Sequence, residues 1–70
     1  MNSYKEFRVG QLLRHPNNPL GSYVQIRGFM QDEETVKVTY YQMRNNNSVG
    51  ERTKTYESFK SYLSAEGYNV

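Results

Sequence analysis

The chain has 70 residues, no cysteine, a single histidine and a formal net charge of +2. This length supports one small domain, and the composition leaves no disulfide and no metal site rich in cysteine or histidine. The chain also lacks a nucleophile elbow, a glycine-rich phosphate loop and any long apolar segment, so we expect a soluble, cytoplasmic protein that is not an enzyme and needs no cofactor.

The N-terminal part of the chain is predicted to contain a tail and a first short strand. Residues 1–6 are polar and are expected to form a loose tail, with one helical turn as the alternative because Ser3 opens a capping-box sequence. Residues 11–15 are expected to form a strand, because Gly10 disfavours a short helix and Pro16 ends the segment.

A helix over residues 4–14 is the alternative for this region, and it would give an α-β-β-β-α fold of the double-stranded-RNA-binding type. The following residues 15–21 include two prolines, two asparagines and a glycine, a composition that predicts a loop. His15 is assigned a structural role in this loop, because no second histidine, cysteine or neighbouring carboxylate accompanies it in the sequence.

Residues 22–43 are the main feature of the sequence and predict two long strands joined by an acidic turn. Their apolar and polar side chains alternate with a period of two, which is typical of half-buried strands. Opposing residues must point to the same face of a sheet, so the expected register pairs Met30 with Val36, Gly28 with Val38, Ile26 with Tyr40 and Val24 with Gln42. The mid-strand glycine at position 28 indicates a bulge or a bend.

The connection between these strands consists of Asp32, Glu33 and Glu34, which we interpret as a solvated turn and not as a metal or acid–base site. Adjacent carboxylates on a hairpin tip point in different directions, and the sequence offers them no partner. Because three of the seven acidic residues gather here, the remaining surface is more basic than the net charge indicates.

The second face of the hairpin is expected to carry aromatic and cationic side chains, with Phe29 beside Lys37 and Arg27 beside Thr39. Tyrosine and arginine are common at protein interfaces, and cations combined with aromatic rings also bind nucleic acids. The predicted partner-binding residues are Tyr23, Arg27, Phe29, Lys37, Tyr41, Arg52 and Lys54.

Two further elements complete the predicted domain. Residues 44–50 are rich in asparagine and predict a turn, and residues 51–55 predict a short polar edge strand with Arg52 and Lys54 on one face. Residues 56–66 predict a helix over one open end of the sheet, with Thr55 and Gly67 as its start and stop signals. The apolar stripe of this helix consists of Tyr56, Phe59, Tyr62 and Leu63.

A run of motifs extends over residues 9–41. It comprises Val-Gly-Gln-Leu-Leu-Arg-His-Pro at 9–16, Gly21, Tyr-Val-Gln-Ile-Arg-Gly at 23–28 and Val-Lys-Val-Thr-Tyr at 36–40. This run resembles SH3-like, Tudor-type barrels, in particular the small module at the C-terminal end of bacterial repair helicases. It covers less than half of the chain, residues 17–21 depart from the family's glycine-rich turn, and the terminal helix is not part of the pattern. The resemblance implies an adaptor that docks on a protein or a nucleic acid.

Together these observations predict one mainly β domain over residues 1–70, an SH3-like small barrel or strongly bent antiparallel meander with a C-terminal helix. We expect a small non-catalytic binding module that acts through protein–protein interaction, such as a virus-encoded or accessory regulator of a nucleic-acid machine. The alternative is a protein that binds DNA or RNA through the aromatic and basic sheet face. The small net charge and the acidic turn favour a protein partner, and no membrane is expected as a partner.

Overall fold

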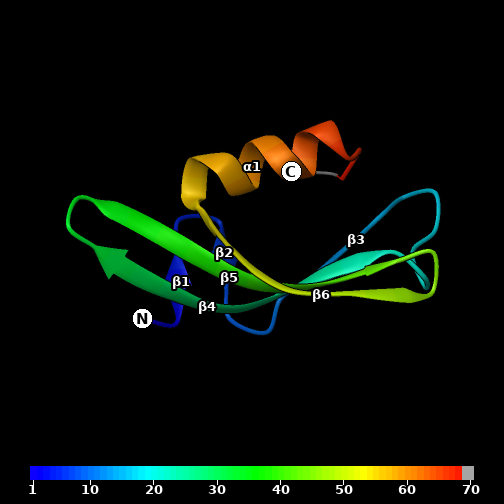
Figure 1. The fold of residues 1–70 in the computed structure, drawn as a ribbon, viewed down its shortest axis with the longest axis horizontal. Coiled ribbons are helices and arrows are strands. Elements are labelled where there is room, and N and C mark those ends of the chain that lie inside the picture. The colour runs from blue at the N-terminus through cyan, green and yellow to red at the C-terminus, as the bar shows by residue number, and fades with distance from the viewer. Residues whose placement is uncertain (69–70) are drawn as a thin grey trace.

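The computed structural model describes residues 1–68 and shows a bent four-stranded antiparallel sheet with one helix on one of its faces (Figure 1). Its elements are β1 (Ser3–Tyr4), β2 (Phe7–Arg8), β3 (Leu12–Arg14), β4 (Tyr23–Asp32), β5 (Thr35–Arg44), β6 (Asn47–Thr55) and α1 (Tyr56–Ala65). The large sheet has the order β3-β4-β5-β6, and β1 pairs with β2 separately. The predicted mainly β fold is therefore confirmed as a bent meander, and the sheets do not close into a barrel.

The β4–β5 hairpin follows the predicted register near the base of the hairpin. Val24 pairs with Gln42 and Ile26 pairs with Tyr40, as expected from the alternation. A bulge then shifts the register between Ile26 and Gly28, which confirms the bulge that the mid-strand glycine indicated.

Beyond the bulge the predicted pairs are wrong. Phe29 lies opposite Val38 instead of Lys37, because the bulge adds one residue to β4 and so reverses the face of every later side chain. The remaining pairs are Gly28 with Thr39, Met30 with Lys37 and Gln31 with Val36. The shift turns Phe29 toward the core, where its ring lies 6.4 Å from that of Tyr4.

Both long hairpins close with two-residue turns, which are shorter than the predicted connections. The β4–β5 turn consists of Glu33 and Glu34, and Glu33 has a left-handed φ of 57°. The β5–β6 turn consists of Asn45 and Asn46, with φ angles of 50° and 67°. Asparagine tolerates this conformation, which suits the twist of the flanking strands. β6 therefore begins earlier than the strand predicted over residues 51–55, although it is an edge strand as expected.

The N-terminal residues form neither a loose tail nor a helix, which corrects both expectations for this region. β1 and β2 pair around a turn at Lys5 and Glu6, and Lys5 has a left-handed φ of 52°. The ring of Phe7 is buried 5.3 Å from that of Phe59, and this contact holds the small hairpin against the helix. Gly10 has a φ of 89°, which interrupts any helix here and excludes the double-stranded-RNA-binding arrangement. The following β3 lies within the strand predicted over residues 11–15, although it is the third strand of the chain and not the first.

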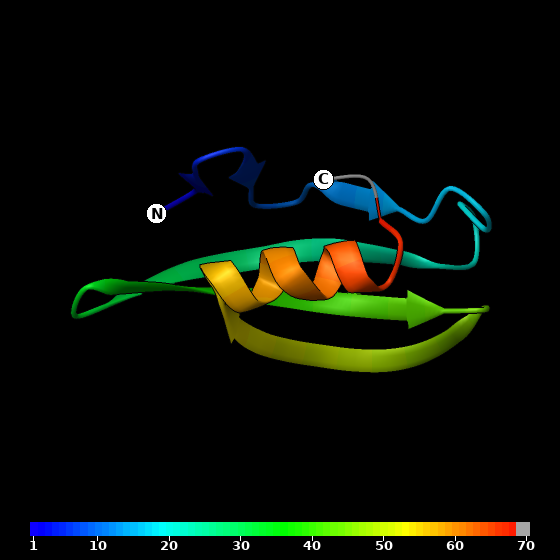
Figure 2. The ribbon, with the colours of Figure 1, turned by 90° about the horizontal axis from the view of Figure 1, so that it is seen from above.

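Helix α1 begins at Tyr56 as predicted and ends at Ala65, one residue before the predicted end. The hydroxyl of Thr55 accepts a hydrogen bond from the backbone N–H of Ser58 at 3.2 Å, and Gly67 has the left-handed φ of 89° that suits a helix end. The helix lies along the face of β5 and β6, as Figures 1 and 2 show, and not over an open end of the sheet. No helix within residues 1–68 is long and apolar enough to cross a membrane.

The core lies between α1 and the inward face of the sheet. Phe59 and Leu63 of the helix are fully buried, as predicted. Burial of side chains of this size stabilises a fold by about 1.5–3 kcal/mol each. The buried cluster consists of Phe7, Val24, Ile26, Val38, Tyr40, Tyr56, Phe59, Leu63 and Tyr68. The helix and the β1–β2 hairpin thus cover one face of the sheet only.

Candidate functional site

The opposite face of the four-stranded sheet has no element of residues 1–68 packed against it, and we call it the open face (Figures 1 and 2). Side chains alternate along β4 and β5, so the neighbours of the buried core residues point to this face. The strand pairing places there Leu12 and Arg14 of β3, Tyr23, Arg27 and Met30 of β4, Lys37 and Tyr41 of β5, and Glu51 of β6.

Two arginines on the open face lie over tyrosine rings. Cζ of Arg27 is 5.3 Å from the ring centroid of Tyr41, and Cζ of Arg14 is 6.0 Å from that of Tyr23. The hydroxyl of Tyr41 donates a hydrogen bond to Oγ of Ser48 at 2.7 Å, which ties this ring to β6. A guanidinium over an aromatic ring can still donate N–H hydrogen bonds to a carboxylate, although Nη1 of Arg14 already donates one to the carbonyl oxygen of Pro19 at 2.8 Å.

The open face carries four of the predicted partner-binding residues: Tyr23, Arg27, Lys37 and Tyr41. The ammonium of Lys37 lies 3.1 Å from a carboxylate oxygen of Asp32, so its charge is balanced locally. Arg14 and Arg27, in contrast, have no ion-pair partner in the part of the chain that the structure describes. The cationic character of this face therefore comes from its two arginines.

The other three predicted residues lie on the helix side of the sheet. Phe29 turns inward because of the bulge, and it packs at the margin of the core. Arg52 pairs with Tyr40 and Lys54 pairs with Val38, so both cations point to the face that α1 covers. The sequence showed that Arg52 and Lys54 share a face, but not which face, because a polar edge strand has no apolar alternation that relates it to its neighbour.

Sequence reasoning missed Leu12, Arg14 and Met30 as members of the open face. Leu12 and Met30 are 41% and 55% exposed, respectively, and are among the most exposed large apolar side chains of the described chain. Met30 was expected in the core because a register without a bulge places it opposite Val36. Leu12 and Arg14 flank Leu13 in one strand, so they must point to the face opposite Leu13. This alternation could have indicated that they share the open face.

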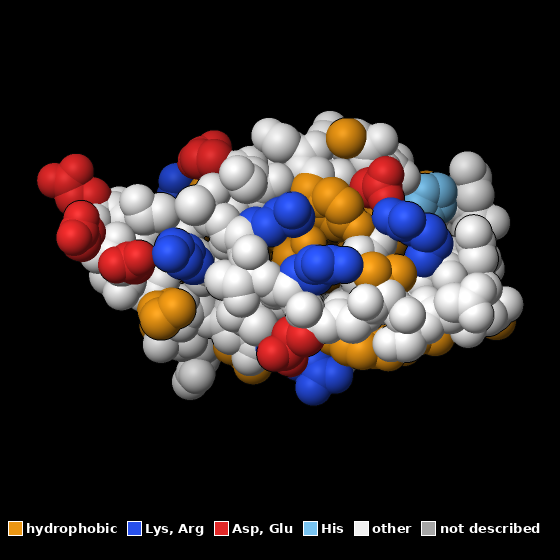
Figure 3. Space-filling model, in the orientation of Figure 1, with side chains coloured by type: hydrophobic (Ala, Val, Ile, Leu, Met, Phe, Trp, Pro, Cys, Tyr) orange, Lys and Arg blue, Asp and Glu red, His pale blue; other side chains and the backbone are white. Residues whose placement is uncertain are grey.

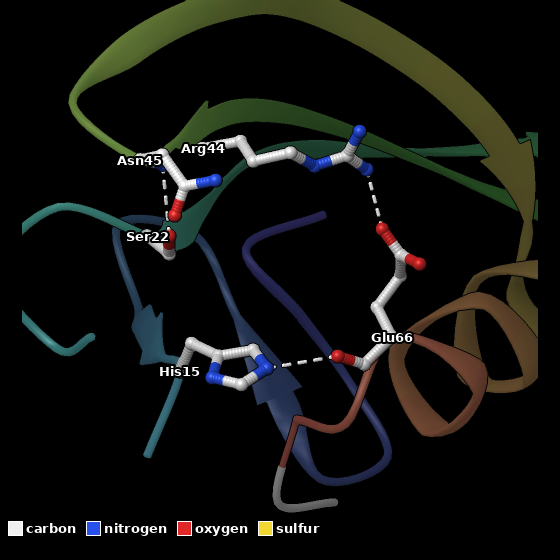
Figure 4. Close-up of polar contacts among 5 residues, drawn as sticks. All are labelled: His15, Ser22, Arg44, Asn45 and Glu66. Carbon is white, nitrogen blue, oxygen red and sulfur yellow. Dashed lines mark hydrogen bonds and ion pairs between the residues drawn. The ribbon is translucent and has the colours of Figure 1, made fainter. Parts of the chain in front are cut away.

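A polar cleft of about 320 Å³ lies where the β3–β4 loop, the β5–β6 turn and the C-terminal end of α1 meet. Figure 4 shows Nε2 of His15 directed at the carbonyl oxygen of Glu66, 2.9 Å away, and the guanidinium of Arg44 paired with the Glu66 carboxylate. The backbone N–H of Asn45 donates to Oγ of Ser22 at 2.9 Å. Every buried side-chain nitrogen or oxygen in residues 1–68 has a partner. These groups hold three chain segments together, in agreement with the structural role predicted for His15.

The acidic turn lies at one end of the molecule, where carboxylates gather at the left of Figure 3. Asp32 ends β4 and pairs with Lys37, while Glu33 and Glu34 are exposed in the turn. Among the residues that the structure describes, no group of three or more histidine, cysteine, aspartate or glutamate side chains could hold a metal ion. The Asp32 carboxylate thus forms an ion pair with Lys37 of the same hairpin.

Two titratable groups on the helix side are strongly perturbed. The hydrogen bond from the Tyr56 hydroxyl, at 2.6 Å, contributes most to lowering the pKa of Glu6 to about 2, and Lys60 adds to the effect. Burial raises the pKa of Tyr40 to about 12, so its hydroxyl stays neutral at ordinary pH. Both groups belong to the packing of α1 and not to the open face.

Comparison of the chain with models of known protein families, with curated proteins and with solved structures finds no match. The function is therefore inferred from the open face and from the distribution of charge around the sheet.

Proposed function

We propose that the protein is a non-catalytic binding module whose open face docks on another protein. The observation that carries this proposal is an uncovered sheet face with two arginine–tyrosine cation–π contacts, flanked by the exposed side chains of Leu12 and Met30. Tyrosine, arginine and methionine are enriched at protein interfaces. Covering apolar side chains of this kind with a partner removes them from water, which favours association.

The charges of the open face indicate the chemistry of the partner. Arg14 and Arg27 give its β3–β4 half a positive charge, whereas Glu51 lies on the β5–β6 half opposite Tyr41. Complementary charge selects partners and orients them during association. We therefore assign to the partner a segment with an apolar anchor and at least one carboxylate, which docks over β3 and β4.

The two arginine–tyrosine contacts limit the conformational freedom that the arginine side chains lose when a partner binds. The Tyr41 ring favours one position of the Arg27 guanidinium, and Arg14 both lies over Tyr23 and donates a hydrogen bond from Nη1 to the carbonyl oxygen of Pro19 at 2.8 Å. These contacts reduce the cost of ordering the two side chains on binding. A carboxylate that accepts two parallel hydrogen bonds from one guanidinium is bound more strongly and in a defined orientation. The resemblance to SH3-like modules implies the same class of function, an adaptor that attaches to a larger assembly.

A selection from a displayed library of random peptides tests the proposal and requires no identified partner. We expect selected peptides to combine aspartate or glutamate with an aromatic or aliphatic residue. Binding of a selected peptide, measured by fluorescence anisotropy, should weaken about tenfold or more in Arg27→Glu and in Tyr41→Ala, as for central interface residues. Lys5→Glu is the matched control, because it makes the same charge change at an exposed cation that lies over the rings of Tyr4 and Tyr56 on the helix side.

Thermal unfolding of each variant establishes that a loss of binding is not a loss of folding. If Arg27→Glu and Lys5→Glu weaken binding equally, the peptide responds to net charge only, and the open face is not the site. A selection that returns no binder, or binders insensitive to all three substitutions, also contradicts the proposal.

A further inference from the structure

A second surface lies on the helix side of the sheet, where the pairing of β5 with β6 places several cationic side chains. We call the residues Arg44, Arg52 and Lys54 the cationic strip. Arg52 and Lys54 alternate along β6 and point to the same face, and Arg44 ends the neighbouring β5. Figure 3, which views the molecule from the β6 edge with α1 above, shows lysine and arginine side chains in the middle of the view, with hydrophobic side chains between them.

Tyr62 of α1 lies among these cations. Nζ of Lys54 is 5.2 Å from the centroid of its half-buried ring. Arg44 lies at the other end of the strip, where the Glu66 carboxylate and, to a smaller extent, Tyr62 raise the pKa of its guanidinium. The strip therefore combines a row of positive charge with one aromatic ring, and it follows the free edge of the sheet.

The cationic strip carries a net positive charge even when its one ion pair is included. Arg44 is paired with Glu66, whereas Arg52 and Lys54 have no ion-pair partner within residues 1–68. These three cations and one carboxylate together carry a charge of +2, which equals the formal net charge of the chain, so the rest of the molecule is neutral in sum. The carboxylates of the β4–β5 turn lie at the far end of the same view (Figure 3).

From this arrangement we propose that the cationic strip binds the backbone of single-stranded nucleic acid without sequence preference. A row of cations neutralises successive phosphates. The Tyr62 ring positions Lys54 at the sheet edge and itself packs on Tyr40, with centroids 5.9 Å apart. We choose a single strand over a duplex because the two unpaired cations, Arg52 and Lys54, lie along one edge strand, which the backbone of one nucleic-acid strand can follow. The strip lies on the other side of the sheet from the open face, so this proposal is independent of the protein-binding function and goes beyond it.

Fluorescence anisotropy with labelled oligothymidylate and oligoadenylate tests the proposal. With two or three phosphate contacts, we expect dissociation constants on the order of 10–100 µM at about 50 mM salt, and about 7- to 18-fold weaker binding at about 200 mM. Both sequences should bind within about threefold of each other, because the contacts are to the backbone.

A pair of charge-matched double variants separates the strip from the general charge of the protein. Arg52→Gln with Lys54→Gln should remove most of the binding and lower the salt slope by about 1.4. Lys5→Gln with Arg8→Gln removes the same charge from the β1–β2 hairpin, which packs against β4 at some distance from the β6 edge, and should leave binding within about twofold. If the first double variant unfolds, Arg52→Gln alone provides the same comparison with Arg8→Gln alone.

Each alternative occupant has its own result. Equal loss in both double variants would show a response to net charge only and would overturn the assignment to the strip. Tighter binding of a DNA duplex would overturn the preference for a single strand, and equal displacement by polyglutamate would replace nucleic acid with an acidic protein. An absence of binding at about 50 mM salt would reject the proposal, because electrostatic binding is strongest at low salt.

Discussion

The ring of His15 donates a hydrogen bond from Nε2 to the carbonyl oxygen of Glu66, and this contact joins the β3–β4 loop to the end of α1. The backbone N–H of Asn17 donates to Nδ1 of the same ring at 3.1 Å, so Nδ1 must be the acceptor and Nε2 carries the hydrogen. The ring also meets the ring of Tyr68 edge-on, with centroids 5.1 Å apart. A single neutral tautomer therefore satisfies every contact of this side chain.

His15→Phe should keep the ring packing on Tyr68 and lose both hydrogen bonds. We expect the free energy of unfolding to fall by about 1–2 kcal/mol, measured by urea denaturation, because the carbonyl of Glu66 loses its donor. Leu20→Ala in the same loop is the control and should change stability by less than about 0.5 kcal/mol, since Leu20 is 84% exposed. Equal stability of His15→Phe and the wild type would show that the contact does not hold the helix end in place.

Gly28 and Gly50 provide a test of backbone strain in the two long hairpins. A Cβ at either position would meet no atom within 4 Å, but Gly50 has a left-handed φ of 108° and Gly28 does not. Gly28→Ala should therefore be neutral or stabilising by up to about 1 kcal/mol, whereas Gly50→Ala should cost about 1–3 kcal/mol. Denaturant midpoints of the two variants measure the difference. A larger cost at Gly28 would mean that the bulge in β4 needs a glycine for a reason other than φ or space.

Phe59→Ala should remove a fully buried ring that contacts the rings of Phe7 and Tyr40 at centroid distances of 5.3 and 4.9 Å. The expected cost is about 3–5 kcal/mol, which is a large part of the roughly 4–10 kcal/mol available to a domain of this size. Thermal unfolding followed by circular dichroism should show a much lower midpoint, or no folded baseline. Ser61→Ala, on the exposed side of the same helix, serves as control. A midpoint for Phe59→Ala within a degree or two of wild type would contradict the packing of α1 on the sheet.

Acid should weaken the contact between the β1–β2 turn and α1. The pKa of Glu6 is lowered from 4.5 to about 2 in the folded protein, chiefly by the hydrogen bond from the Tyr56 hydroxyl. Because the pKa of Glu6 is lower in the folded than in the unfolded protein, its ionised carboxylate stabilises the fold fully above pH 4.5. This stabilisation is lost as the pH falls from 4.5 toward about 2. The effect should stay below about 1 kcal/mol, because the Glu6 side chain is 44% exposed and solvent screens its charge.

Glu6→Gln should accordingly reduce stability near neutral pH and flatten the fall in melting temperature between pH 4.5 and about 2. Glu34→Gln is the comparison variant, because Glu34 has no hydrogen bond or ion pair from its side chain among the described residues. A pH profile that is equally steep in Glu6→Gln and in wild type would assign the acid sensitivity to other carboxylates.

Local sequence patterns were sufficient to predict the elements that depend on residues close together in the chain. The alternation around Ile26 and Tyr40 identified the hairpin and half of its register, and the positions of Thr55 and Gly67 identified the limits of α1. Phe59 belongs to the buried core as its helical spacing indicated. These features depend on neighbouring residues of one strand pair or one helix, so short-range physics is enough to specify them.

The N-terminal hairpin could not be deduced in the same way. The first residues have no alternation or helical stripe of their own, and they are held by the contacts of Tyr4 and Phe7 with Tyr56 and Phe59. Those partners lie about fifty positions away in the chain, and hydrophobic burial is not directional. Only the folded molecule shows that α1 and this hairpin share one core.

The sequence by itself determined that the protein is small and mainly β, with a capped C-terminal helix and many tyrosine and basic residues. Tertiary structure decided how those residues are divided: Arg27 with Tyr41 on the open face, and Arg52 with Lys54 on the helix side. The physical reason is that side chains alternate across a sheet with a period of two, so one bulge in β4 or the register of one edge strand moves a side chain from one face to the other.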